Sequence, residues 1–263
     1  MTVFVYELRQ NARYIAGWTA AMALCIFCMT PVYYSFIDMA GWDSPVFATM
    51  ADSDFFRSAG ISIELLQQPL GIYSFLTSFF MLAAGVFGLH FGISIYTKEW
   101  SGGSREYLFT KPCTRAALLG GKAGAVACGG AAVGGAYLLA SWLSMSVFRP
   151  GFEPRAFFLI AFSLVLVLFF FAAAGLLIGV AFPHDRNPLL TAGALVILLY
   201  CMSSFSRVIG WDALGYLTPF AYFSAADIVQ TGFYAWGKLL CCLGGMAVFL
   251  LAAFRLARTK DVR

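Results

Sequence analysis

The sequence predicts an all-α integral membrane protein: a single transmembrane domain over residues 1–263 with six spanning helices. Apolar residues make up 61% of the chain and charged residues only 11%, whereas a soluble domain has about 45–50% and about 25%. Six long stretches contain no charged residue, and Lys and Arg are unevenly distributed between the segments that connect them. This composition excludes a soluble globular enzyme, a disordered chain and a disulfide scaffold.

Each spanning helix is predicted from a stretch without Asp, Glu, Lys or Arg, because about 20 apolar residues are needed to cross a bilayer. The shortest stretch, 239–254, has 16 residues, but Lys238 at its start can snorkel to the interface. Runs of this length satisfy their backbone in lipid only as helices. Pro31 is expected to kink the first helix. The predicted spans are 15–37, 73–97, 118–147, 156–182, 188–208 and 235–256.

The basic residues predict the orientation. Twelve of the 17 belong to the two termini and to the loops at 98–122 and 183–187. With the acidic residues included, this side carries +7 and the other side −3, which agrees with the overall charge of +4. Because loops rich in Lys and Arg stay in the cytoplasm, we expect a multi-pass protein of the cell (inner or plasma) membrane with both termini cytoplasmic. The positive charge then anchors the chain in the bilayer and indicates no nucleic-acid partner.

Three segments outside the spans carry further expectations. Residues 1–13 alternate apolar with charged residues, which predicts an N-terminal amphipathic interfacial helix. The outer loop 38–72 is acidic, but Asp52 and Asp54 lack the spacing of a calcium-binding loop and are read as solvated acids. Residues 207–237 are apolar but interrupted by Gly and Pro, which predicts short helices that dip back into the outer leaflet.

The loop 98–122 is basic and short. Ser101 or Ser104 can cap a small helix that Pro112 would end. Such a helix would present Tyr107, Leu108 and Phe109 as an apolar patch that could dock on a cytoplasmic partner. The residues alone are equally consistent with an ordinary positively charged loop.

Small residues recur at a spacing of four in the second, third and fourth spans. Glycines at this spacing let two helix backbones approach closely. We interpret them as packing within one bundle in preference to a dimer face. The candidate packing residues are Gly88, Gly92, Gly120, Gly124, Gly130 and Gly134.

No metal or redox site is predicted. The seven Cys are odd in number and form no framework, and the Cys25–Cys28 pair stands inside an apolar helix without a second pair. His90 and His184 are the only histidines and lie far apart in the sequence. The cysteines are interpreted as small apolar residues.

The chain resembles the permease subunits of ABC transporters, specifically the ABC-2-type exporter family with the type V fold. Two weaker features are the six-span plan and the basic tail from Phe254-Arg255 to Lys260-Asp261. A third is the motif Leu217-Thr218-Pro219-Phe220-x-Tyr222-Phe223 before the last span. The most specific feature is the loop Glu99-x-x-Gly102-Gly103-x-x-Glu106-x-Leu108-x-x-Lys111-Pro112-x-x-Arg115.

The resemblance implies that this loop forms a short cytoplasmic coupling helix, at about 101–110, which contacts an ATPase. It assigns the coupling role to Glu99, Gly103, Arg105, Glu106, Tyr107, Leu108, Pro112 and Arg115. It also implies two copies of an ABC ATPase subunit, which bind ATP and Mg²⁺, and a second permease half in a homodimer or heterodimer. The chain itself has no phosphate-binding loop, since the nearest window, 116–123, lacks the first Gly and the Ser or Thr after Lys122. It would therefore bind no cofactor and be the non-catalytic part of the transporter.

The function implied is export of a hydrophobic or amphipathic substrate such as a peptide, antibiotic or lipid, because few charges lie within the spans. Two alternatives work without an ATPase. An ion-coupled carrier would need an ionisable group at membrane depth, for which His90 is the candidate. A membrane binding or immunity protein would hold a toxin without pumping it. An intramembrane enzyme is disfavoured because the spans contain no paired carboxylates and no His cluster.

Overall fold

The computed structural model describes residues 3–40, 70–101 and 115–259. In these ranges the regular secondary structure is helical and contains no strand. Six helices are long and apolar enough to cross a membrane, and the apolar span within each begins and ends within three residues of its prediction. The prediction of an all-α protein with six spans is therefore confirmed. The six are α2 (Ala12–Ala40), α6 (Gly71–Ser101), α8 (Arg115–Phe148), α9 (Pro154–Ala181), α10 (Pro188–Ile209) and α13 (Trp236–Thr259).

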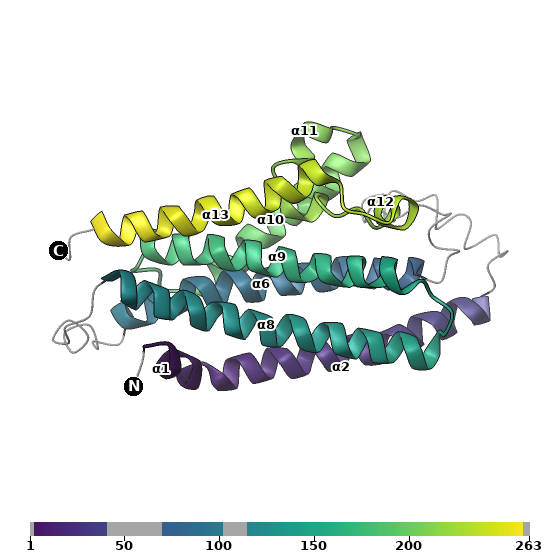
Figure 1. The fold of residues 1–263 in the computed structure, drawn as a ribbon, viewed down its shortest axis with the longest axis horizontal. Helices are drawn as coiled ribbons and strands as arrows, with labels where there is room; N and C mark the ends of the chain where they lie inside the picture. The colour runs from purple at the N-terminus through teal and green to yellow at the C-terminus, as the bar shows by residue number, and fades with distance from the viewer. Residues whose placement is uncertain (1–2, 41–69, 102–114, 260–263) are drawn as a thin grey trace.

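The long helices lie side by side in one elongated bundle (Figure 1). The short helix α1 (Val3–Gln10) lies at the same end as the last residues of α6, the first residues of α8 and the C-terminal end of α13. We call this the α1 end. Three short helices, α11 (Asp212–Gly215), η1 (Pro219–Ala221) and α12 (Ala225–Thr231), lie between α10 and α13 in the sequence, toward the opposite end, which we call the cap end.

Proline and glycine set several helix boundaries. Pro154 and Pro188 occupy the first turns of α9 and α10, where a missing N–H leaves no intrahelical bond unmade. Gly210 ends α10 with a φ of 74° and Gly232 ends α12 with a φ of 68°. Glycine adopts this left-handed backbone without a Cβ penalty. These stops separate the cap-end helices from the spans on either side.

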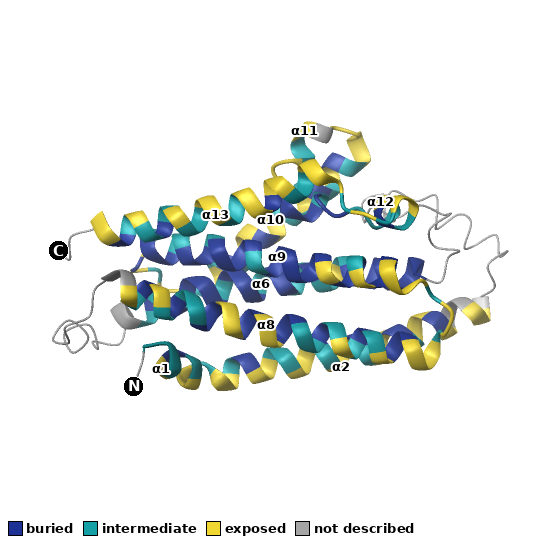
Figure 2. Cartoon of the chain, in the orientation of Figure 1, coloured by how far each residue is buried: buried dark blue, intermediate teal, exposed yellow. Residues whose placement is uncertain are grey.

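The centre of the bundle is the pair α6 and α9, which carry most of the buried residues (Figure 2). Their backbones approach so closely that a Cβ on Gly88 would collide with the carbonyl oxygen of Leu168. A Cβ on Gly92 would lie 2.6 Å from the carbonyl oxygen of Ala172, and one on Gly175 would collide with that of Leu89. Real Cβ atoms do not make such contacts, so glycine is required for this helix pair to form.

The four candidate packing glycines of α8 differ among themselves. Gly130 lies against the side chains of Leu168 and Phe169 of α9, and Gly134 against Val165 of α9. Gly124 lies against the ring of Phe4 of α1, whereas a Cβ on Gly120 would have nothing within 4 Å. Three of the four therefore face other helices of this chain, and Gly120 meets no neighbour among the described residues.

Helix α2 continues through Pro31 to Ala40. Proline lacks the N–H that would bond to the carbonyl of Phe27 four residues earlier. The Oγ of Ser144 in α8 donates a hydrogen bond to that carbonyl oxygen over 3.1 Å. A neighbouring helix thus supplies the donor that Pro31 removes, as the membrane interior requires.

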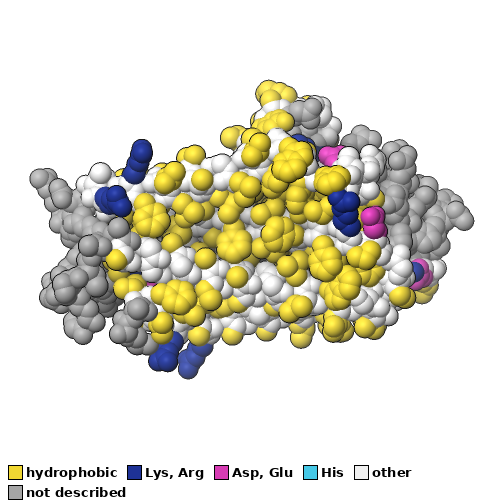
Figure 3. Space-filling model, in the orientation of Figure 1, with side chains coloured by type: hydrophobic (Ala, Val, Ile, Leu, Met, Phe, Trp, Pro, Cys, Tyr) yellow, Lys and Arg dark blue, Asp and Glu magenta, His cyan; other side chains and the backbone are white. Residues whose placement is uncertain are grey.

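The outer surface of the bundle is apolar in its middle. On the face drawn in Figure 3, the charged side chains of the described residues gather toward the two ends. Large hydrophobic side chains of the long helices, such as Leu24, Leu139, Leu198 and Leu251, are exposed on the surface of the bundle. Exposed apolar surface of this kind suits lipid as the surrounding solvent.

Candidate functional site

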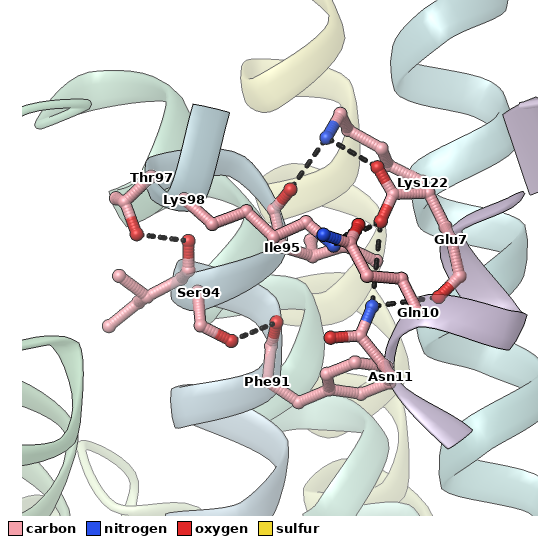
Figure 4. Close-up of polar contacts among 10 residues, drawn as sticks. Glu7, Gln10, Asn11, Phe91, Ser94, Ile95, Thr97, Lys98 and Lys122 are labelled. Atoms are coloured by element: carbon pink, nitrogen blue, oxygen red, sulfur yellow. Dashed lines mark hydrogen bonds and ion pairs between the residues drawn. The ribbon is translucent and has the colours of Figure 1, made fainter. Parts of the chain in front are cut away.

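A polar cluster lies at the α1 end and joins three helices (Figure 4). Its centre is the carboxylate of Glu7 in α1, which is 1% exposed. Lys98 of α6 and Lys122 of α8 both donate to this carboxylate. Gln10 and Asn11 from the N-terminal segment complete the cluster.

Two contacts fix the position of α1 against α8. Gly121 leaves room for Val3, since an added Cβ would lie 3.0 Å from that of Val3. Gly124 similarly accommodates the ring of Phe4, which an added Cβ would approach to 3.3 Å. Gly121 and Gly124, near the start of α8, therefore let α1 pack closely enough against α8 for Glu7 to reach Lys122.

The local backbone orients Glu7. Asn11 stands at the junction between α1 and α2, and both its backbone N–H (3.1 Å) and its side-chain amide (2.8 Å) donate to the carbonyl oxygen of Glu7. The same amide lies 3.5 Å from Glu7 Oε2. Asn11 thus couples the start of α2 to the residue that holds the cluster together.

Lys122 is the most buried cation of the cluster, with 0% of its side chain exposed. Its Nζ donates to Glu7 Oε1 over 2.9 Å and to the carbonyl oxygen of Ile95 in α6 over 2.6 Å. The ammonium also lies 5.9 Å from the ring centroid of Tyr96. An isolated buried ammonium is strongly disfavoured, and the carboxylate and the carbonyl oxygen supply the polar partners that this buried side chain needs.

Lys98 lies at the edge of the cluster and binds the second oxygen of the Glu7 carboxylate, so that Glu7 bridges Lys98 and Lys122. Its side chain is 24% exposed and pairs with Glu7 Oε2. It also donates to Gln10 Oε1 over 2.9 Å. One carboxylate between two ammonium groups leaves the cluster with a net charge of +1.

The cluster includes one residue from each of the two helices that flank the segment predicted to couple to an ATPase. Lys98 lies in the last turn of α6, which ends at Ser101, and Lys122 lies in the second turn of α8, which begins at Arg115. Glu7 therefore ties both helices that flank 102–114 to the N-terminal helix. The sequence marked Glu7 only as a charge on an amphipathic helix, and Lys122 only as a basic residue after the loop.

Most residues predicted for coupling lie outside the described residues. Glu99 and Arg115 belong to the terminal turns of α6 and α8, and only their backbones are described. The coupling roles and the short cytoplasmic helix remain predictions, as does the interpretation of Asp52 and Asp54 in the outer loop. The residues outside the described ranges are Gly103, Arg105, Glu106, Tyr107, Leu108 and Pro112.

His90 is engaged in a packing contact within the bundle. Its Nδ1 lies 2.7 Å from the hydroxyl of Tyr14 in α2. The ring of Tyr14 stacks on Phe87 at 5.6 Å between centroids and also touches Phe91. His90 is therefore bound to one phenol among aromatic rings, an arrangement that suits a packing role.

Within residues 3–40, 70–101 and 115–259, no group of three or more His, Cys, Asp or Glu could hold a metal ion. Cys25 and Cys28 are both exposed on α2 with free thiols.

Comparison with known proteins identifies the family of this chain. A search of curated proteins gives no match. The model of a protein family described as ABC-2 family transporter protein matches residues 2–262, which is nearly the whole chain. Six apolar helices and this match together indicate a multi-pass membrane protein. The chain therefore belongs to the ABC-2 transporter family and is a permease of the ABC transporter class.

Proposed function

We propose that the chain is the membrane-spanning half of an ATP-driven exporter, in which a separate ABC ATPase hydrolyses ATP. Two ATPase copies, each with ATP and Mg²⁺, and a second permease half would complete the transporter. The second half is either another copy of this chain or a related one. In this arrangement the α1 end faces the cytoplasm of the cell and the cap end faces outward.

The observation that carries the proposal is the bridge from Glu7 to Lys98 and Lys122. A force applied to 102–114 acts on the end of α6 and the start of α8, and Glu7 links both of them to α1. Buried, mutually satisfied charges hold helices in one geometry, because separating them leaves a desolvated ion. The three helices are therefore expected to move together when an ATPase pulls on the loop.

Contacts between packed helices connect α1 and α6 to the rest of the bundle and would carry the movement into the membrane. Asn11 joins α1 to α2, so α2 follows α1. The glycine contacts of Gly88 and Gly92 lock α6 to α9, and α10 also packs on α6. Closure of the ATPases would then tilt α2, α6 and α10 and open a path between the two permease halves.

A hydrophobic or amphipathic substrate is favoured because the spans carry few charges. Ion-coupled carriers usually keep ionisable groups near the middle of the membrane. The one histidine of α6, His90, is bonded to Tyr14.

The test is purification of the full chain in mild detergent, followed by assay for a co-purifying ATPase and for transport per ATP hydrolysed after reconstitution. We expect Glu99→Gln and Arg105→Gln to release the ATPase. Lys98→Gln should retain the ATPase but reduce transport per ATP, since it loosens one arm of the bridge and leaves the buried Glu7–Lys122 pair intact. Asp38→Asn, which removes an exposed ion pair with Arg149, is the matched control and should change neither.

The competing function is a carrier or binding protein that works without an ATPase. A chain that purifies alone under all conditions, with no ATP hydrolysis, would favour that function and contradict the proposal. Full coupling in Lys98→Gln, with the ATPase bound, would contradict the bridge while leaving the ATPase partner in place.

A further inference from the structure

A cavity of about 440 Å³ lies toward the cap end, away from the Glu7 cluster. It is lined by α6, α9 and α10, by the segment that contains α11, η1 and α12, and by the first turn of α13. A cavity of this size is within the range of small-molecule sites, about 300–1,000 Å³. Its charged lining residues are Arg207, Asp227 and Lys238.

The walls of the cavity are held in place by hydrogen bonds. Arg207 at the end of α10 donates through Nη2 to the carbonyl oxygen of Phe220 over 2.5 Å. The hydroxyl of Tyr222 donates to the carbonyl oxygen of Tyr216 over 2.7 Å. Phe220 is 3% exposed and packs against Phe171 of α9. The cavity is thus preformed, so little ordering is required of the protein when a ligand enters.

The charged residues of the cavity come from three elements. Arg207 lies on α10, Lys238 on the first turn of α13 and Asp227 on α12, which gives the site a net charge of +1. In the described part of the chain, Lys238 makes no hydrogen bond or ion pair with another residue. A half-buried ammonium that faces a cavity without a protein partner suits an anionic ligand group.

The hydroxyl groups that line the cavity suit a different part of a ligand, one that donates hydrogen bonds. Ser74, Ser78 and Ser163 donate their protons to the carbonyl oxygens of Gly71, Ser74 and Ile160. Their oxygens therefore offer the cavity lone pairs, which accept hydrogen bonds. Together with the Asp227 carboxylate, they suit a ligand that also carries hydroxyl donors.

Aromatic side chains beside the cavity indicate its depth in the bilayer. Trp211, Tyr216 and Trp236 are 59%, 51% and 72% exposed. Exposed Trp and Tyr at the end of a transmembrane bundle mark the level of the lipid head groups. The cavity therefore lies at the level of the polar part of an amphiphile, whose tails can remain in the adjoining hydrocarbon.

We propose that this cavity binds the head group of an anionic phospholipid that combines a phosphate with free hydroxyls, as in phosphatidylglycerol. Arg207 and Lys238 contact the phosphate, and Asp227 with the serine oxygens accepts from the hydroxyls. The inference concerns binding by this chain alone and does not depend on an ATPase or on transport.

The test uses the full chain in detergent, titrated by calorimetry with short-chain phosphatidylglycerol. Phosphatidylmethanol with the same chains retains the phosphate but lacks the hydroxyls, and inorganic phosphate lacks the lipid. We expect phosphatidylglycerol to bind most tightly. Lys238→Gln should lower the affinity for both lipids by about tenfold or more, the effect of losing one hydrogen bond to a charged group. Asp227→Asn should reduce the preference for phosphatidylglycerol over phosphatidylmethanol.

Arg255→Gln is the matched control, because Arg255 is an exposed cation near the other end of the same helix α13. It should leave both affinities unchanged. Equal weakening by Arg255→Gln and Lys238→Gln would overturn the site, because binding would then follow overall charge. Binding of inorganic phosphate as tight as that of the lipid would overturn the lipid assignment, and unchanged affinities in Lys238→Gln would overturn the proposal itself.

Discussion

Glu7 and Lys122 form a buried ion pair between α1 and α8, with Oε1 and Nζ 2.9 Å apart and side chains 1% and 0% exposed. Lys122 also donates to the carbonyl oxygen of Ile95, and the other carboxylate oxygen of Glu7 accepts from Lys98. A residue near the N-terminus is thereby tied to the two helices that enclose 102–114. Separation of the pair would leave a buried charge without its partner, and in the proposed function the same pair transmits movement between these helices.

Removal of one partner from this pair should destabilise the protein strongly. Glu7→Gln leaves the fully buried Lys122 without a counter-charge, a loss of about 3–5 kcal/mol for pairs of this kind. The double variant Glu7→Gln with Lys122→Met should recover part of the loss, since no buried charge then lacks a partner. Thermal unfolding of the purified protein in detergent measures both effects.

The control for this prediction is the ion pair at the other end of the bundle. Asp38 is 52% exposed and pairs with Arg149, so Asp38→Asn should change stability by about 1 kcal/mol or less. If Glu7→Gln unfolds at the same temperature as Asp38→Asn, the buried pair contributes no more than an exposed one and its structural role is wrong.

His90 provides a second prediction. Because its Nδ1 is bonded to the Tyr14 hydroxyl among aromatic rings, we expect His90→Asn to lower the unfolding temperature while transport by the reconstituted protein persists. Tyr14→Phe should have a similar effect on stability, since it removes the other half of the hydrogen bond. Loss of transport in His90→Asn with unchanged unfolding would instead support a proton-relay role.

The helices could be predicted from the sequence, whereas the Glu7 cluster could not. Long uncharged stretches permit only one backbone solution in lipid, so the limits of α9 and α10 follow from composition and from Pro154 and Pro188. Glu7 belongs to a short helix whose charges look solvated in isolation. Its partner Lys122 is 115 residues away in the sequence. No local sequence pattern indicates which face of α1 packs against α8. The glycines at the start of α8 were the available signal, because they mark where another helix can approach.

Glycine-to-alanine substitutions should distinguish glycines that are required for close helix contacts from glycines that are not. Gly175→Ala places a methyl against the carbonyl oxygen of Leu89 in α6, so we expect a loss of about 1–3 kcal/mol from forced separation of α6 and α9. The methyl of Gly120→Ala would meet nothing within 4 Å in the described part of the chain, and the change removes a flexible residue from a helix, so it should be neutral or slightly stabilising. Unfolding temperatures in detergent compare the two. A destabilised Gly120→Ala would mean that this face of α8 contacts something beyond the chain.

The hydrogen bond from Ser144 to the carbonyl oxygen of Phe27, four residues before Pro31, allows a prediction in which a second substitution rescues the first. Ser144→Ala leaves the carbonyl oxygen of Phe27 without a donor in a part-buried position, and an unsatisfied group of this kind costs about 1–3 kcal/mol. In a Pro31→Ala background, the restored N–H of residue 31 can bond to that carbonyl, so Ser144→Ala should then have much less effect. A thermodynamic cycle from the unfolding of the four proteins gives the coupling between the two residues. Additive effects would show that the Ser144 hydroxyl does not substitute for the N–H that proline lacks, whereas coupling that accounts for most of the Ser144→Ala loss would establish that α8 completes the backbone of α2.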